Sequence, residues 1–369
     1  MKKSLALVYG VLALALLALP GLLSLLGVRG ENYEKRALAS PPALVKDGAY
    51  NPSWVTGAAD YFDDTFALRG QFISAYGAAM EAAFAQSANP QVIVGRQGYL
   101  FFEPTLSDYL RDAPLPQADI DEMARRLIAL EKRLAQRGVQ LLVTIGPNKN
   151  SIYPEMMPGR YRPLDAPGNL DLLGEALANQ AFYLDVRPAL WARKDETELY
   201  HRLDSHWNAL GAAIAYDAMA DAMGEAGAAM RRYANLPYTR NKSWDGDLVA
   251  MTKPALGIKD WQVFLMHGDT SPKEPYPFTA NPPMRSTEDV RIHTQSDASE
   301  AGQLPKLLIY RDSFTNALIP FIAANAQEAL FSRAVPYNFD LLDEIDADIV
   351  IIEIVERNIP ELLSALPQD

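Results

Sequence analysis

Short apolar segments alternate with helical patterns through most of this chain, and this order constrains the fold more than any other feature. Strands that are apolar along their whole length are typical of a parallel sheet covered by helices on both faces. We therefore predict an α/β fold with a mostly parallel sheet flanked by helices. The predicted strands lie at residues 140–145, 182–186, 262–266, 306–310 and 348–355, and the main predicted helices at 117–137, 209–223 and 315–324.

The composition is that of a globular protein that can bury a full core, with 49% apolar and 22% charged residues among 369. Acidic residues outnumber basic ones by 46 to 34, and no stretch gathers Lys and Arg as a nucleic-acid surface would. Nucleic acid is therefore not an expected partner. The absence of cysteine excludes disulfides, thiolate metal sites and a cysteine nucleophile.

The first 29 residues differ in kind from the rest. Lys2 and Lys3 precede an almost uncharged run at residues 4–28, which has the length of a bilayer-spanning helix. We interpret residues 1–29 as an uncleaved transmembrane anchor, with a cleaved signal peptide as the alternative. The two lysines favour an inside N-terminus, which puts the remaining chain outside the cytoplasm, on the periplasmic or extracellular face.

Residues 30–90 read as a linker followed by an amphipathic helix. Residues 30–60 hold several prolines and glycines with little periodicity, whereas aromatic and aliphatic residues recur at helical spacing over 60–84. We expect this helix to pack on the main domain, assigned to residues 91–369. That domain opens with two short apolar runs, 92–94 and 99–102, separated by turn residues, a pattern that predicts a β-hairpin.

Two short motifs supply a serine, a histidine and a carboxylate. The first is Asp204-Ser205-His206-Trp207, and the second, Arg311-Asp312-Ser313-Phe314, follows the predicted strand at 306–310. A serine hydroxyl needs a base to remove its proton and a carboxylate to orient that base. In open α/β sheets the active site forms at the carboxyl ends of the strands. We therefore predict Ser313 as nucleophile, His206 as base and Asp204 as its orienting group.

Other interpretations of these motifs remain open. Ser313 begins a predicted helix, where serine is a common cap, and Asp204 precedes another helix start. The backbone N–H of Ser313 is the one oxyanion donor we can name, helped by the dipole of that helix. Asp204, His206 and His201 are candidate metal ligands, but neither a third histidine nor a further acidic ligand follows at a recognised spacing, so no metal is predicted.

The two motifs together resemble the SGNH hydrolase-like family of alginate O-acetyltransferases, AlgJ and AlgX, and their DHHW relatives. Arg311 departs from the glycine that many SGNH enzymes have before the aspartate, and Ser205 stands where some relatives have a second histidine. The resemblance extends over residues 30–360 and includes these further segments: 31–38, 61–69, Gly95-Arg96-Gln97-Gly98-Tyr99-Leu100-Phe101, Pro147-Asn148-Lys149, Ile152-Tyr153-Pro154-Glu155, Asp245-Gly246-Asp247-Leu248 and Glu356-Arg357.

The resemblance implies an SGNH hydrolase-like catalytic domain outside the cytoplasm that O-acetylates an exopolysaccharide or cell-wall polysaccharide through an acetyl-serine, without a cofactor. It also implies a membrane-bound O-acyltransferase as the partner that supplies acetyl groups. A polysaccharide acetylesterase and a catalytically idle scaffold of an export complex are the alternatives. Five polar or aromatic residues are candidates for substrate binding: Lys149, Tyr153, Trp207, Trp244 and Arg357.

Overall fold

The computed structural model describes residues 2–32, 38–266, 278–297 and 301–368. His267 and most of the family-like segment at 31–38 lie outside the described residues. The chain forms two compact units, which we describe separately. The N-terminal unit comprises residues 1–94 and 245–259, and the sheet unit comprises 95–244 and 260–369. Residues 245–259, which lie within the range we predicted for the main domain, thus belong to the N-terminal unit.

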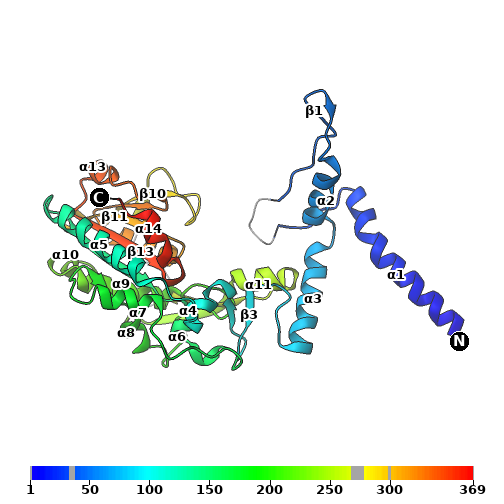
Figure 1. Cartoon of the computed structure of the whole chain (residues 1–369), viewed down its shortest axis with the longest axis horizontal. Helices are drawn as coiled ribbons and strands as arrows, with labels where there is room; N and C mark the ends of the chain where they lie inside the picture. The colour runs from blue at the N-terminus through cyan, green and yellow to red at the C-terminus, as the bar shows by residue number, and fades with distance from the viewer. Residues whose placement is uncertain (1, 33–37, 267–277, 298–300, 369) are drawn as a thin grey trace. The chain divides into compact units, whose positions relative to one another are not determined.

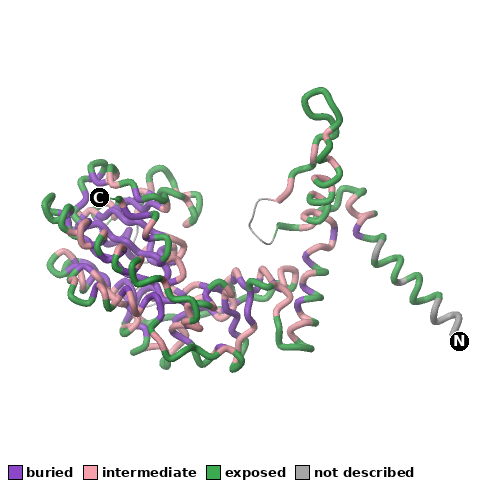
Figure 2. Tube along the Cα trace, viewed as in Figure 1, coloured by how far each residue is buried: buried purple, intermediate pink, exposed green. Residues whose placement is uncertain are grey.

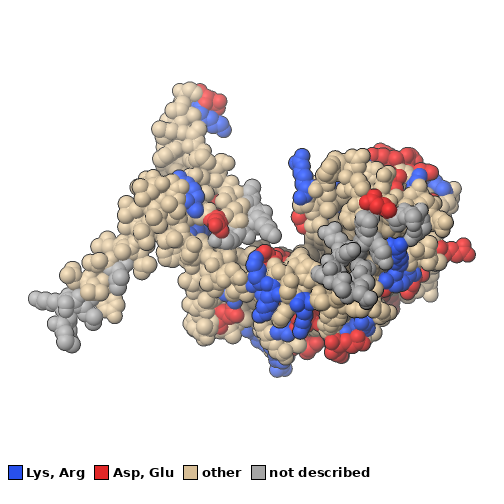
Figure 3. Space-filling model, turned by 180° about the vertical axis from the view of Figure 1, so that it is seen from behind, with Lys and Arg blue, Asp and Glu red and all other residues tan. Residues whose placement is uncertain are grey.

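The N-terminal unit begins with the predicted apolar helix. This helix, α1, is long and apolar enough to cross a membrane. Its described side chains are largely exposed, and Figure 3 shows that part of it free of acidic and basic groups. The helices of this unit are α1 (Lys2–Leu25), α2 (Trp54–Thr65), α3 (Arg69–Phe84) and α11 (Asp247–Thr252), and its strands are β1 (Val45–Lys46), β2 (Ala49–Tyr50) and β3 (Val92–Val94).

The single helix predicted at residues 60–84 is two helices, α2 and α3. The backbone turns extended at Phe66 and left-handed at Leu68, which has φ 68°, and these conformations end α2 and start α3. The residues that α3 buries are small: Gly70, Ser74 and Gly77. A Cβ on Gly77 would come within 2.2 Å of the Thr252 carbonyl oxygen, so this glycine allows α3 to approach the end of α11 closely.

The sheet unit contains a seven-stranded sheet in the order β6-β5-β13-β11-β12-β10-β9 (Figure 1). The first five strands are parallel, whereas β10 and β9 pair antiparallel at one edge. The mostly parallel sheet predicted from the sequence is thus confirmed. The strands are β5 (Gln140–Gly146), β6 (Tyr183–Leu184), β9 (Phe278–Ala280), β10 (Arg291–Ser296), β11 (Lys306–Arg311), β12 (Glu328–Ser332) and β13 (Ile349–Val355).

Helices cover both faces of this sheet. On one face, residues of α5, α7, α13 and α14 join those of β5, β11 and β13 in a large buried cluster, while α9 and α12 contact strands from the other. This core forms the purple interior in Figure 2. The helices of the unit are α4 (Leu106–Leu110), α5 (Gln117–Ala135), α6 (Lys149–Ile152), α7 (Asn169–Ala176), α8 (Arg187–Trp191), α9 (Ala209–Ala222), α10 (Glu225–Ala228), α12 (Ile319–Ala324), α13 (Leu341–Ile345) and α14 (Leu362–Ala365).

The strand β13 lies between β5 and β11, and every one of its residues is buried. Six of the seven are Ile or Val, as expected for a central strand covered on both faces. The exception is Glu353, whose side chain is fully buried. Smaller strands complete the unit: β4 (Leu100–Phe102) follows the Gly95–Gly98 turn, and β7 (Tyr238–Trp244) pairs antiparallel with β8 (Asp260–Leu265).

Candidate active site

Ser313 lies on a tight turn directly after β11, at the carboxyl edge of the parallel strands. Asp312 fixes this turn. Its Oδ1 accepts a hydrogen bond from the Phe314 N–H at 2.8 Å, and its Oδ2 accepts from the Val355 N–H at 2.7 Å and from Asn358 Nδ2 at 2.9 Å. Because Val355 ends β13, Asp312 ties the turn to the neighbouring strand.

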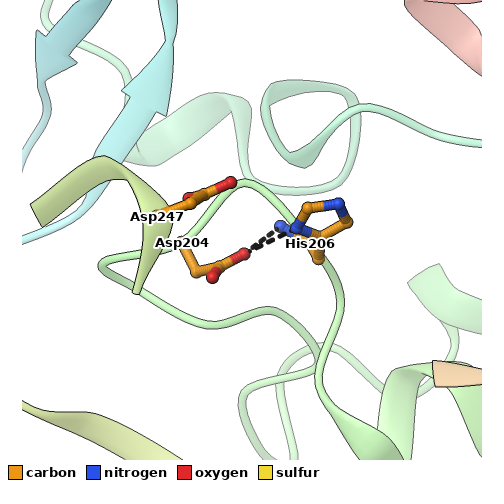
Figure 4. Close-up of side chains that lie close together, drawn as sticks. All are labelled: Asp204, His206 and Asp247. Carbon is orange, nitrogen blue, oxygen red and sulfur yellow. Dashed lines mark hydrogen bonds and ion pairs between the residues drawn. The ribbon is translucent and has the colours of Figure 1, made fainter. Parts of the chain in front are cut away.

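His206 lies within hydrogen-bonding distance of both predicted partners. Its Nε2 is 2.9 Å from Ser313 Oγ, and its Nδ1 is 2.8 Å from Asp204 Oδ1. The same carboxylate oxygen accepts the backbone N–H of His206 at 2.9 Å, which holds the loop in the shape drawn in Figure 4. The geometry therefore brings the three residues into the order serine, imidazole, carboxylate that proton transfer from serine requires.

Asp204 is almost fully buried, and its second oxygen accepts a hydrogen bond from the indole Nε1 of Trp244 at 3.0 Å. Burial by itself raises the pKa of Asp204. Hydrogen bonds from His206 and the charges of His206 and His201 outweigh it, so the pKa of this carboxyl lies well below its usual range. Asp204 is thus an ionised carboxylate at neutral pH, as a group that stabilises an imidazolium must be.

Lys149 stabilises the loop that carries Asp204 by binding its main-chain carbonyls. Its Nζ donates hydrogen bonds to the carbonyls of His201 at 3.0 Å, Arg202 at 3.1 Å and Asp204 at 2.6 Å. Its side chain is buried, so the prediction that Lys149 binds substrate is corrected: it binds main-chain carbonyls within the protein. Asp260 adds a further hydrogen bond to this loop, from the Leu203 N–H to Oδ2 at 2.6 Å.

Tyr153 and Trp207, predicted to stack on sugar rings, are also corrected. They are 4% and 2% exposed, and a buried ring has no face for a sugar. The Tyr153 hydroxyl accepts the Leu199 N–H at 2.9 Å, and Trp207 Nε1 donates to the Phe314 carbonyl at 2.9 Å. Both rings therefore support the two loops that carry the candidate triad.

Trp244 and Arg357 remain near the site. The Trp244 indole, which binds Asp204, also stacks on His201 with ring centroids 4.5 Å apart. Sequence reasoning missed this contact between Trp244 and Asp204 because the two residues are 40 positions apart. The Arg357 guanidinium lies over the Phe314 ring at 5.4 Å, and that ring lies 5.1 Å from the His206 ring.

One expectation about the oxyanion region changes, and the neighbouring Arg311 is held within the protein. The helix predicted at residues 315–324 is a 3₁₀ turn, Phe314–Ala317, followed by the short helix α12, so a helix dipole directed at Ser313 is wrong. Arg311 is buried, and its guanidinium donates to the carbonyls of Thr287 and Asp289 and to Asn316. Burial and the nearby Arg333 lower the pKa of Arg311 to about 10.

His201, considered as a metal ligand, has its Nδ1 at 2.9 Å from the Trp261 carbonyl oxygen. Burial lowers its pKa, which favours a neutral imidazole that donates to that carbonyl. The stacked Trp244 and this hydrogen bond make His201 part of the packing that positions Trp244.

Part of this chain is similar in sequence to known proteins. Residues 92–270 match the family model described as the SGNH hydrolase-like domain of acetyltransferase AlgX. Two curated relatives are named probable alginate O-acetylase AlgJ. The one from Pseudomonas aeruginosa is 31% identical over 137 residues, and the one from Pseudomonas putida is 27% identical over 179 residues. These matches cover 37% and 47% of this chain, and only 34% and 44% of the relatives' own lengths.

Among solved structures, Bacillus cereus PatB1 with a sulfonyl adduct is similar in fold, with a TM-score of 0.51 and 14% sequence identity. That match covers 71% of this chain and 92% of the other. The resemblance read from the motifs is thus confirmed. The chain has the SGNH hydrolase-like fold, and its residues 92–270, which include Asp204 and His206, are similar to the SGNH hydrolase-like domain of AlgX.

Proposed function

We propose that this protein transfers acetyl groups to hydroxyls of a polysaccharide, outside the cytoplasm, through an acetyl-serine at Ser313. The observation that carries the proposal is the pair of contacts at His206, 2.9 Å to Ser313 Oγ and 2.8 Å to Asp204. The names of the relatives, probable alginate O-acetylases, support acetyl transfer to a polysaccharide, and alginate is therefore the first acceptor to test.

In the first half-reaction, His206 Nε2 takes the proton of Ser313 Oγ while Oγ attacks the acetyl carbonyl carbon. The tetrahedral intermediate collapses, and the leaving group departs with the proton from His206. Acetyl-Ser313 remains. The Ser313 N–H is the donor we assign to the oxyanion, and Asp204 stabilises the imidazolium that forms in this step.

In the second half-reaction, a sugar hydroxyl gives its proton to His206 as its oxygen attacks the acetyl carbon. Ser313 Oγ then leaves and regains that proton. The net change moves one acetyl group from donor to sugar and consumes no cofactor. We propose that α1 anchors the protein in the membrane, close to a membrane-bound O-acyltransferase that supplies the acetyl groups.

The test follows the mass of the intact full-length protein in detergent after mixing with a small activated acetyl ester. We expect a gain of one acetyl group that is absent in Ser313→Ala and in His206→Ala. Ser364→Ala, on an exposed residue of α14, serves as the matched control and retains the gain. Adding alginate oligosaccharides then discharges the acetyl group onto sugar.

Each alternative has its own outcome in the same experiment. Acetate released to water at the same rate with and without sugar indicates an esterase. Sugar binding without any acetylation that depends on Ser313 indicates a scaffold protein and refutes the proposed mechanism.

A further inference from the structure

Glu353 is the most unusual buried group that the mechanism leaves unused. It occupies the fifth position of β13, where its neighbours in register are Arg311 on β11 and Thr144 on β5. The side chain is 0% exposed. A carboxyl group in the middle of a parallel sheet costs free energy unless it is neutral or well bonded, so its presence calls for a structural or functional reason.

One oxygen of Glu353 is bound to the turn that carries the nucleophile. The Thr315 hydroxyl donates a hydrogen bond to Glu353 Oε2. Thr315 is two residues after Ser313 and is itself 0% exposed. The 3₁₀ turn that follows Ser313 is therefore attached to the central strand from its buried side, while Asp312 attaches its start to Val355.

The other oxygen, Oε1, has no hydrogen-bond partner among the described residues and packs against Gly146 at the end of β5. A Cβ at position 146 would lie 2.8 Å from Oε1, 2.9 Å from Phe314 Cδ1 and 3.4 Å from Trp207 Cη2. Glu353 Oε1, the Phe314 ring and the Trp207 ring thus all lie close to Gly146. The Phe314 ring in turn packs against the His206 imidazole.

The surroundings favour the neutral acid. Burial and the charge of Asp312 raise the pKa of Glu353 well above its usual value, and the Thr315 hydrogen bond and the charges of Arg311 and Arg357 oppose this only in part. A neutral carboxyl keeps its hydrogen bond to Thr315 without placing a second negative charge beside Asp312.

We propose that Glu353 is a positioning residue: through Thr315, it holds the Ser313–Phe314 turn where Ser313 Oγ meets His206 Nε2. This inference rests on the proposed role of Ser313 as nucleophile. The proposal assigns no contact with substrate to Glu353, because this side chain is fully buried.

Two pairs of variants test the proposal in the full-length protein. Thr315→Val removes the hydroxyl that Glu353 binds. Thr144→Val, the matched control, removes a buried hydroxyl on the adjacent strand that donates to the Leu184 carbonyl at 2.9 Å and does not reach the turn. Glu353→Leu removes both carboxyl oxygens at similar volume, whereas Glu353→Gln keeps one acceptor oxygen.

The first readout is the rate constant for acylation of Ser313 by the activated acetyl ester, determined separately from the KM for that ester. We expect Thr315→Val and Glu353→Leu to lower this rate constant by roughly ten- to a hundredfold with little change in KM, because a displacement near 1 Å has effects of that order. Glu353→Gln restores most of the rate, and Thr144→Val stays within about twofold of the wild type. Equal rates in Thr315→Val and Thr144→Val would overturn the proposal.

The second readout needs no turnover. The ¹⁵N resonance of His206 Nε2 reports its hydrogen bond to Ser313, and we expect it to shift in Thr315→Val and to stay in place in Thr144→Val. An unchanged resonance in Thr315→Val contradicts the positioning role. If the wild type is never acylated, the proposed function fails, and the resonances still decide the role of Glu353.

Discussion

Replacing Trp244 with Phe tests how much the buried candidate triad depends on one indole N–H. The Nε1 of Trp244 donates to Asp204 Oδ2 at 3.0 Å, and Asp204 is almost fully buried. A hydrogen bond to a charged group contributes about 1.5–3 kcal/mol to stability. In Trp244→Phe the buried Asp204 carboxylate loses this donor and gains no water in its place. We expect Trp244→Phe to lower the free energy of unfolding at pH 7 by that amount, measured by urea denaturation.

The dependence on pH distinguishes this hydrogen bond from packing. The pKa of Asp204 is depressed in the folded protein, so the stability it contributes is present above its unfolded value, about 3.9, and is lost as the pH falls through the folded pKa. Losing the indole N–H raises that folded pKa. The difference in stability between wild type and Trp244→Phe is therefore largest at neutral pH and shrinks in acid.

Trp261→Phe is the matched control. Trp261 lies on the same β7–β8 ribbon, and its ring contacts Arg240 and Lys242 rather than a carboxylate. The same change of ring at this position is expected to produce a loss of stability that does not vary below pH 5. If the two variants lose equal stability with the same pH profile, the assigned hydrogen bond to Asp204 does not stabilise the fold and the reasoning is refuted.

Two further predictions concern buried groups. Gly146→Ala places a Cβ against Glu353 and Phe314, and we expect a lower melting temperature, corresponding to a loss of about 1–3 kcal/mol of stability. Gly302→Ala is the control, because nothing lies within 4 Å of a Cβ at that position. Equal melting temperatures for the two variants would contradict the packing around Gly146. Burial raises the pKa of Glu356 to about 7, so the wild type loses stability as the pH rises from about 4.5 to 7 and then levels off. Urea unfolding across that range is expected to show no such loss in Glu356→Gln, and parallel profiles would disprove the assignment.

Much of the sheet was predictable because its central strands are buried on both faces. The segments 140–145, 306–310 and 348–355 are continuous apolar runs, and each lies within one residue of β5, β11 and β13. The strands β9, β10 and β12 were missed. β10, which lies next to the edge strand β9, mixes exposed and buried residues, so its signal is weaker, and it lies in a region rich in proline.

The candidate triad was readable because each motif keeps its residues close in sequence, and Asp204 and His206 meet across one intervening residue. The residues that surround the candidate triad could not be predicted from the sequence. Lys149 reads as a substrate contact because it is a lone cation near a strand end, but its Nζ meets three carbonyls more than 50 residues away. No local pattern records such a contact.

The sequence by itself determined the parallel sheet, the apolar N-terminal helix and the identity of the three residues that meet at the carboxyl edge. These features depend on periodicity and on motifs within a few residues, which the chain carries locally. Only the tertiary structure decided that Trp244 binds Asp204, that Tyr153 and Trp207 are buried, and that Glu353 lies beneath the Ser313 turn. These are contacts between distant segments, and burial and pairing there depend on how the strands and loops come together in space.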